Sequence, residues 1–242
     1  LAGSATRTAS LAHTVAASLG LPPPDAPVGK TERYTLYKVG PVLCASHGIG
    51  IPSISVLLHE LAKLLFHAKA TGVTFLRLGT CGGLGLEPGT IVISNQAVDH
   101  KLRPVDKIPV CGTSLRLSSV FDAGLAAKLE ELAAGDGTPT APAIATARGS
   151  TFCATGFYVN QARLDGAIAT VTQEQRAEWL QACHDAGVRN IEMESLRLAG
   201  FCSHLGIRAG MVSAVIVNRL KGDQIVLTAA ELATASGNAV QL

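Results

Sequence analysis

The chain has 242 residues, of which 48% are hydrophobic and 16% charged, and its formal net charge is +2. This length allows one large α/β domain and does not require a second. The small net charge and the lack of a long basic run argue against nucleic acid or an acidic membrane surface as the main partner. No apolar run reaches the length of a membrane span, and the first residues do not read as a signal peptide.

The six cysteines are scattered along the chain and form no C-x-x-C pair: Cys44, Cys81, Cys111, Cys153, Cys183 and Cys202. Most have apolar neighbours. This usage is typical of reduced, mostly buried thiols in a cytoplasmic protein.

The first part of the chain opens with "LAGSATRTAS", which reads as the turn after a strand and suggests that a segment precedes it. Apolar spacing then predicts a helix over residues 8–19. A proline-rich loop follows at 22–27. Residues 33–48 read as two strands joined by a tight turn at Val39–Gly40, which favours antiparallel pairing.

The middle of the chain alternates between the two periodicities. Residues 52–70 have helical apolar spacing, with Ser53 as the expected N-cap. Two apolar, β-branched runs, 73–79 and 89–99, predict strands. A helix is expected over residues 124–135, bounded by glycines.

The rest of the chain repeats this alternation. The patterns predict, in chain order, a strand at 145–155, a helix at 173–188, a short strand at 190–195, a helix at 195–206, a strand at 207–217 and a helix at 228–242. Strands that are apolar on both faces and alternate with helices indicate a central sheet covered on both sides. No linker separates domains, so residues 1–242 are expected to form a single α/β domain.

Three arginines lie where an anion could bind. Arg7 is in a glycine- and serine-containing turn that opens a helix, and Arg33 precedes a strand. Arg77 stands in an apolar strand just before "GTCGG". Glycine-rich turns expose backbone N–H donors, and arginine adds a bidentate fork. For Arg7 and Arg33, pairing with a surface carboxylate is an equally good alternative. No G-x-G-x-x-G or lysine-bearing phosphate loop is present.

Several long motifs resemble the uridine phosphorylases of the nucleoside phosphorylase family, the animal-type members most closely. They are "YKVGPVLCASHGIGIPSISVLLHELAKLL", "RLGTCGGLGLEPGT", "FYVNQARLDGA", "GVRNIEMES" and "NRLKGDQI". The resemblance extends over about residues 1–225. It implies a single α/β domain whose central mixed β-sheet is distorted towards a barrel and flanked by α-helices.

The resemblance also implies a reaction: phosphate attacks the anomeric carbon of uridine, giving uracil and ribose 1-phosphate. Inorganic phosphate would then be a co-substrate and the anionic partner of Arg77, with no cofactor and no metal. The residues that match the family's phosphate site are Gly3, Arg7, Arg33, Arg77, Gly79 and Thr80. Arg33 would enter the site of a neighbouring subunit, which implies a homodimer, with a hexamer as the less favoured assembly.

The ribose and base sites follow from the same resemblance. Met193 and Glu194 match the ribose site, although "EME" taken alone favours a surface strand. The residues that match the uracil site are Cys81, Gly82, Phe157, Gln161, Arg163, Ile216 and Val217. Arg77, Arg163 and Glu194 are the expected catalytic residues. An amide and a guanidinium side by side suit an N–H beside a carbonyl.

Two positions depart from the family's pattern, and two others are expected to act indirectly. The family usually has Ser or Thr where this chain has Cys81, so the backbone amides of Cys81 and Gly82 are the expected donors there, and the family's N-terminal histidine at the ribose has no match. His47 is expected to be structural, and Arg219 to reach the base through water.

Two kinds of alternative stay open. One is a purine nucleoside phosphorylase or a nucleosidase of the same fold, against which Gln161, Arg163 and the three arginines argue. The other is a catalytically inactive paralogue that acts as a binding protein. Preference between uridine, deoxyuridine and thymidine, and the net direction of the reaction in pyrimidine salvage, are also open.

Overall fold

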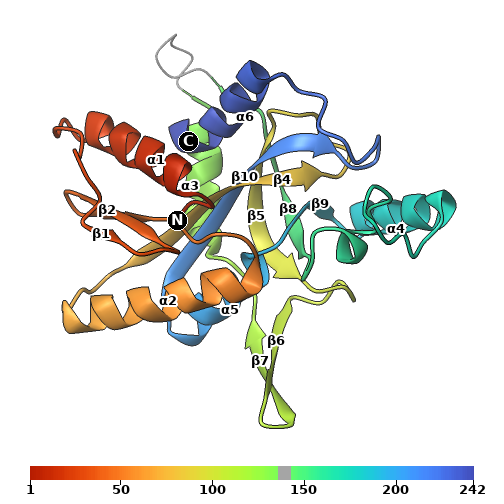
Figure 1. Ribbon diagram of the computed structural model, residues 1–242, viewed down its shortest axis with the longest axis horizontal. Helices are drawn as coiled ribbons and strands as arrows, with labels where there is room; N and C mark the ends of the chain where they lie inside the picture. The colour runs from red at the N-terminus through yellow and green to blue at the C-terminus, as the bar shows by residue number, and fades with distance from the viewer. Residues whose placement is uncertain (136–142) are drawn as a thin grey trace.

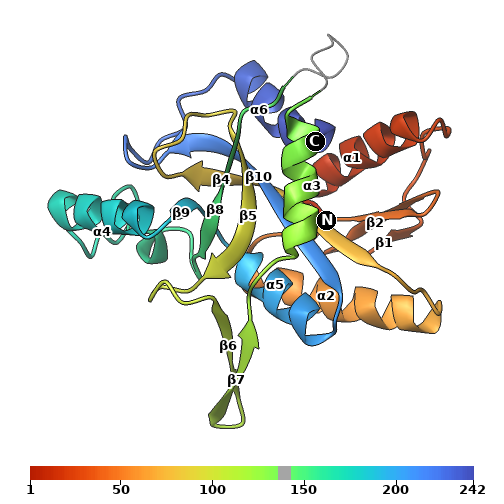
Figure 2. The same cartoon turned by 180° about the vertical axis from the view of Figure 1, so that it is seen from behind.

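The computed structural model describes residues 1–135 and 143–242. Its centre is a closed barrel with the strand order β10-β4-β9-β8-β5 (Figures 1 and 2). The barrel strands are β4 (Thr74–Gly83), β5 (Ile91–Val98), β8 (Thr146–Cys153), β9 (Val188–Glu192) and β10 (Arg208–Asn218). Parallel and antiparallel pairings are mixed within it. The expected α/β domain with a mixed sheet distorted towards a barrel is confirmed.

In the described residues six α-helices surround the barrel. They are α1 (Ala5–Ser18), α2 (Gly50–His67), α3 (Ala123–Ala133), α4 (Gln173–Asp185), α5 (Ser195–His204) and α6 (Ala229–Gln241). Figure 1 shows α2 beside α5 on one flank, α1 near α6 on another, and α4 set apart next to β9. Each expected helix is present, and α1 begins three residues earlier than predicted because the Ser4 side chain caps it by accepting from the Arg7 N–H.

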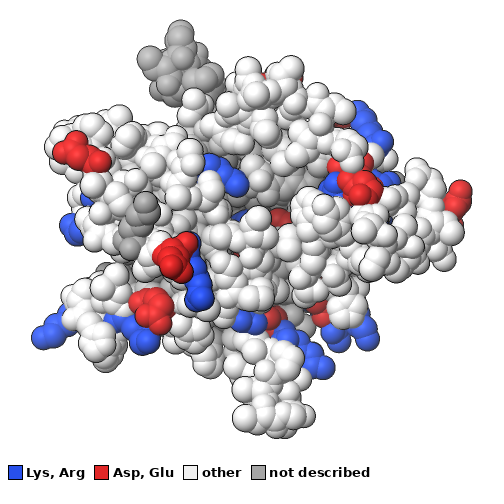
Figure 3. Space-filling view, viewed as in Figure 1, with Lys and Arg blue, Asp and Glu red and all other residues white. Residues whose placement is uncertain are grey.

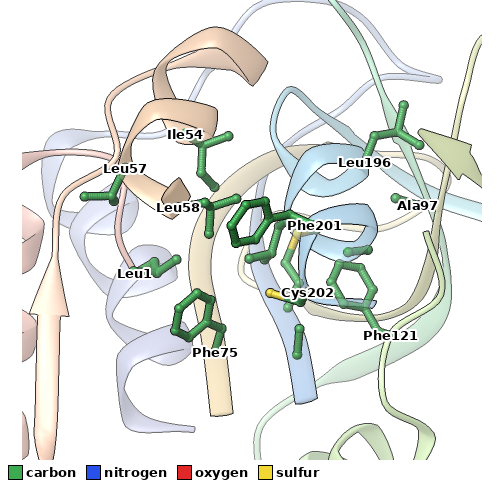
Figure 4. Close-up of a cluster of buried hydrophobic side chains, with 14 of the residues drawn as sticks. Leu1, Ile54, Leu57, Leu58, Phe75, Ala97, Phe121, Leu196, Phe201 and Cys202 are labelled. Atoms are coloured by element: carbon green, nitrogen blue, oxygen red, sulfur yellow. The ribbon is translucent and has the colours of Figure 1, made fainter. Parts of the chain in front are cut away.

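The largest hydrophobic cluster lies between α2, α5 and the barrel. Figure 4 shows Leu58, Phe75 and Phe201 from these three parts pointing toward one another. The buried face of α2 supplies Ile54 and Leu58, both with no exposed surface. This packing fixes the starts of α2 and α5, and both starts border the cavity described below.

A three-stranded sheet precedes α2. It contains β1 (Gly29–Lys30), β2 (Thr35–Val39) and β3 (Val42–Ala45), and β2 pairs with β3 in antiparallel register. The turn at Gly40 has φ +52°, a left-handed conformation that glycine adopts at low cost. The predicted hairpin and its turn are confirmed.

The predicted N-cap of α2 is wrong. The helix begins at Gly50, and the Ser53 hydroxyl donates to the His47 carbonyl oxygen at 2.6 Å. Gly48 and Gly50 both have positive φ, so the chain turns into the helix before Ser53 is reached. Pro52 fits the first turn, where its missing N–H is not needed.

A hairpin that the sequence analysis did not assign lies between β5 and α3. It consists of β6 (Val105–Val110) and β7 (Thr113–Ser118) and extends away from the body of the protein (Figure 1). Its turn residues, Cys111 and Gly112, have φ +46° and +75°, as the tightest hairpin turns require. The base of the hairpin is tied to α5 by an ion pair between Asp106 and Arg197 at 2.6 Å.

All six cysteines lie in the described residues as free thiols, and five of them are buried. The exposed one, Cys111, is at the hairpin turn. In the described ranges no helix is both long and apolar enough to cross a bilayer.

Candidate functional site

A cavity of about 340 Å³ opens where several segments meet at one end of the barrel. Figure 3, viewed from the same side as Figure 1, shows a hollow near the centre of the molecule, with atoms of charged residues visible inside it. The residues from the expected site that line the cavity are Gly3, Arg7, Arg77, Gly79, Thr80, Cys81, Gly82, Phe157, Gln161, Arg163, Met193, Glu194, Ile216 and Val217. The fold therefore brings together every expected site residue except Arg33, which is exposed on the segment before β2 and lines no part of the cavity.

The start of α1 forms one wall of the cavity. Arg7 folds back over Gly3, so a Cβ atom at Gly3 would lie 3.3 Å from an Arg7 Nη atom. Burial lowers the pKa of Arg7, and the nearby Arg77 guanidinium lowers it further. A helix start and two guanidinium groups on one wall favour an anion.

Arg77 is the central charge of the cavity, and it is only 3% exposed. Its Nη2 donates to a Glu194 carboxylate oxygen, and its Nη1 lies 3.1 Å from Glu192 Oε2. Burial alone would lower the pKa of Arg77, but Glu194 and Glu192 raise it above its ordinary value. Two glutamates of the chain itself balance this charge, and a further contact with phosphate stays a prediction.

Gly79 makes room for this guanidinium. A Cβ atom at position 79 would lie 2.7 Å from Arg77 Nη1, closer than side-chain atoms approach one another. The glycine after Arg77 in "RLGT" is thus required by the neighbouring arginine. The sequence analysis had assigned it only to phosphate.

The two glutamates sit where β9 ends and α5 begins. Glu192 is the last residue of β9, and its carboxylate accepts from the Glu194 N–H at 2.9 Å and from the Ser195 N–H at 3.1 Å. It therefore holds the start of α5 as well as Arg77. Glu192 and Glu194 are each only 5% exposed, so the surface-strand interpretation of "EME" is wrong.

Glu194 reaches across to the loop before α2. The Gly50 N–H donates to Glu194 Oε1 at 2.5 Å. Burial raises the pKa of Glu194; Arg77 opposes this shift and Glu192 adds to it. Met193, between the two glutamates, lines the cavity because β9 ends at Glu192.

His47 is a third partner of the Arg77 guanidinium, after Glu192 and Glu194. Its Nε2 accepts from the Arg77 Nε–H at 3.2 Å, so the ring is neutral with its proton on Nδ1. Burial, and then the charge of Arg77, lower the pKa of His47 to about 2. A base of this strength does not take up a proton near neutral pH, which agrees with the expected structural role.

The other end of the cavity is built around Gln161. Arg219, which has no exposed surface, donates from Nη1 to Gln161 Oε1 at 3.1 Å and from Nη2 to the Gln161 carbonyl oxygen at 2.7 Å. Arg219 thus has direct contacts with Gln161, and its expected contact with the base through water stays a prediction. Gly82 makes this possible, because a Cβ atom there would lie 2.6 Å from Arg219 Cγ.

Arg163 lies beside Gln161 at the rim. Its guanidinium is 4.5 Å from the centre of the Phe157 ring and donates to Asp165 Oδ1 at 2.8 Å. Its Nη2 also donates to the Asp223 carbonyl oxygen at 3.0 Å. Phe157 is 48% exposed, so it borders the cavity and does not belong to the core.

Ile216 and Val217 line the same cavity although neighbours on a strand normally face opposite sides. The pairing of β10 with β4 skips Ile216, because Val215 pairs with Cys81 and Val217 with Gly82. This bulge turns both side chains toward the cavity.

Cys81 directs its thiol into the barrel wall. The Sγ atom lies 3.5 Å from the Ala214 carbonyl oxygen and packs with Val92 and Val215. Burial raises the pKa of the Cys81 thiol to about 12. It is therefore a neutral donor to β10.

Four contributors to the site were missed by the sequence analysis or given no role in it: Glu192, Asp223, Arg176 and the loop around Ile49. Glu192 and Asp223 lie inside quoted motifs, so their positions were a usable signal. No sequence signal pointed to Arg176, because it lies on α4 among other polar residues.

Comparison with known proteins agrees with this geometry. Residues 1–241 match the family described as "Phosphorylase superfamily". The chain belongs to the phosphorylase superfamily. Mouse uridine phosphorylase 1 is 42% identical over 227 residues, which are 92% of this chain and 71% of that protein. The resemblance inferred from the motifs is confirmed.

Two further relatives from Schistosoma mansoni bear on function. The crystal structure of its uridine phosphorylase in complex with uracil has a TM-score of 0.91 and 37% identity, covering 99% of this chain and 82% of that chain. A protein named inactive uridine phosphorylase B is 38% identical over 224 residues, 92% of this chain and 74% of that protein. Membership in the superfamily therefore leaves activity to be decided by the site itself.

The buried state of His47 predicts a loss of stability in acid. The folded pKa of about 2 lies below the value of 6.5 in the unfolded chain, so the unfolded chain binds the extra proton as pH falls below 6.5. Between pH 7 and 5 this residue removes about 2 kcal/mol from the free energy of unfolding. Urea unfolding at pH 7, 6 and 5 measures it.

The matched variants are His47→Gln, which keeps an acceptor for Arg77 and does not titrate, and His13→Gln, which changes an exposed histidine of α1. The first should flatten the acid-side slope and the second should leave it unchanged. Equal slopes in the wild type and His47→Gln would contradict the account.

Proposed function

We propose that the protein is a uridine phosphorylase, which catalyses reversible phosphorolysis of uridine to uracil and ribose 1-phosphate. The observation that carries the proposal is the one cavity with Arg7 and Arg77 at one end and Gln161 and Arg163 at the other. The uridine phosphorylase names of its relatives support it. Pyrimidine salvage and a cytoplasmic location are part of the proposal.

The phosphate end suits a nucleophile that the protein does not have to supply. A phosphate oxygen attacks C1′ of uridine, the C1′–N1 bond breaks, and its electron pair leaves with uracil. Arg7, Arg77 and the Thr80 hydroxyl would hold the phosphate, while Glu194 would bind ribose hydroxyls and Met193 would pack on the sugar. The enzyme's task is to position the reactants and to match the charges that develop.

The base end suits a leaving group that gains negative charge. Gln161 can donate to a uracil carbonyl and accept from N3–H, and Arg163 can stabilise a carbonyl oxygen as the base departs. Ile216 and Val217 would form the apolar wall beside the ring. A purine places its six-membered ring farther from C1′ than uracil does, so its donors and acceptors would not meet these groups, which disfavours a purine nucleoside phosphorylase.

The charges at the phosphate end favour a contribution from a second subunit. Arg7 and Arg77 supply two positive charges there, but Glu192 and Glu194 supply two carboxyl groups. A phosphate dianion placed beside this nearly balanced set needs another cation. Arg33 is exposed and free to enter the site of a neighbour, so we include a homodimer in the proposal.

An inactive paralogue that acts as a binding protein is the second candidate, because one similar relative is named as inactive. The presence of Arg7, Arg77, Gln161, Arg163 and Glu194 in one cavity supports catalysis over this alternative.

The test is uracil release by the purified chain, with uridine, thymidine and inosine as substrates, each with and without inorganic phosphate. We expect release from uridine only with phosphate, and none from inosine. Phosphate-independent release would identify a nucleosidase. No release from any substrate, with phosphate still raising the melting temperature, would identify a binding protein.

Replacing Arg33 with Ala tests the shared site. We expect the KM for phosphate to rise on the order of tenfold or more, as loss of a charged contact predicts, with the KM for uridine little changed. Arg148→Ala, at an exposed arginine outside the cavity, is the matched control. Unchanged phosphate kinetics, or full activity in a sample whose light-scattering mass equals one chain, would refute the shared site.

A further inference from the structure

Asp223 lines the base end of the cavity and joins three separate segments there. It lies in the loop after β10, and its Oδ1 accepts from Arg176 Nη2 of α4 at 2.7 Å and from Arg219 Nε at 2.9 Å. Its Oδ2 accepts from the Leu164 N–H at 3.2 Å. This one carboxylate therefore connects α4, the end of β10 and the segment that carries Arg163.

The Arg219 guanidinium is fully engaged by this arrangement. Its Nε faces Asp223, and both Nη atoms face Gln161. Burial lowers the pKa of Arg219, and the nearby Arg163 and Arg176 add to the effect, while Asp223 opposes it. Without the carboxylate, three guanidinium groups would repel one another in a space that holds no excess of negative charge.

The position of Arg219 decides which way the Gln161 amide faces. Oε1 must lie toward the guanidinium, because a flipped amide would set N–H donors against N–H donors. The Gln161 NH₂ group and one Oε1 lone pair then remain for a base. Gln161 is only 5% exposed, so if its amide flipped, water could not replace the hydrogen bond with Arg219 without a large cost in free energy.

Arg176 supports the same carboxylate from the side away from the cavity. It is 4% exposed, does not line the cavity, and also donates to the Arg219 carbonyl oxygen at 2.7 Å. Any effect of Arg176 on the base must pass through Asp223 and Arg219.

We propose that Asp223, anchored by Arg176, is a positioning residue: its carboxylate fixes the Gln161 amide through Arg219 and the segment of Arg163 through the Leu164 N–H, and so selects uracil over cytosine. Uracil presents N–H beside a carbonyl, whereas cytosine presents a bare ring nitrogen beside an amino group. An amide locked in one orientation pairs with the first pattern and leaves the second with mismatched groups. This inference rests on the proposed function and adds the residues that set its base specificity.

The experiment uses Asp223→Ala, Asp223→Asn and Arg176→Met, with separate KM values for uridine and phosphate. We expect the KM for uridine to rise on the order of 10- to 100-fold in Asp223→Ala, with less change in the other two. The KM for phosphate should stay within about twofold, because the phosphate end does not contact this network. Asp223→Asn keeps an acceptor, so it serves if the alanine variant does not fold.

Asp99→Asn is the matched control. Asp99 is likewise a loop aspartate that pairs with an arginine, Arg103, and its side chain is 11% exposed against 10% for Asp223, but it lies outside the cavity. It should lower the melting temperature and leave both KM values unchanged. Equal increases of both KM values in the Asp223 variants, or no increase for uridine, would overturn the inference while leaving the phosphorylase function intact.

A wild-type chain that does not cleave uridine would instead count against the proposed function. Calorimetric binding of uracil and cytosine then tests the positioning role alone. Loss of a preference for uracil in Asp223→Ala, with the preference kept in Asp99→Asn, would support it. The same preference in wild type and Asp223→Ala would overturn it.

Discussion

The buried charge of Arg77 is the constraint on which the site depends. A guanidinium in the wall of the barrel is costly unless oppositely charged partners surround it. Those partners come from the junction of β9 and α5, while His47 comes from the loop before α2. Satisfying this single charge therefore brings three distant segments together around one end of the cavity and leaves an arginine that cannot move freely.

Each end of the cavity holds a buried charge among partners of the opposite sign, and the sign of the central charge differs between the two ends. At one end an arginine lies between two glutamates, and at the other an aspartate lies among three arginines. Each cluster ties its segments through charges that have little access to water, where such contacts are stronger than at the surface. Phosphate bound at one end and the nucleoside base bound at the other would meet donors that are already oriented. Donors oriented in advance toward developing charge are usually the largest contribution to lowering the activation free energy.

Glycines next to the charged residues give these clusters their room. Gly79 lies under the Arg77 guanidinium and Gly82 under the Arg219 side chain, and a methyl group at either would collide with them. The motif "RLGTCGG" thus encodes the packing of two arginines, one within it and one near the end of β10.

Much of this could be predicted from the sequence because local patterns carry it. The alternation of helices and strands indicated the α/β class, and an arginine in an apolar strand indicated a functional charge. The family resemblance supplied the site residues. The partners of Arg77 could not be predicted from local patterns, because Glu194 is 117 residues away and only the closed barrel brings it near.

Other misses have equally specific causes. The bulge at Ile216 is a register shift between two strands, which periodicity within one strand does not reveal. The start of α2 was placed at Ser53 because serine is a common N-cap, whereas two glycines with positive φ end the loop earlier. The hairpin of β6 and β7 depends on a Cys111–Gly112 turn that lacks the usual Asn-Gly signal.

A crystal structure of the chain with phosphate and uracil bound tests the central claim most directly. The account predicts phosphate beside Arg7, Arg77 and Thr80, uracil beside Gln161 and Arg163, and Arg77 still paired with Glu192 and Glu194. Phosphate bound elsewhere, or Arg77 turned away from both glutamates to reach it, would contradict the view that these carboxylates hold the arginine in place for the anion.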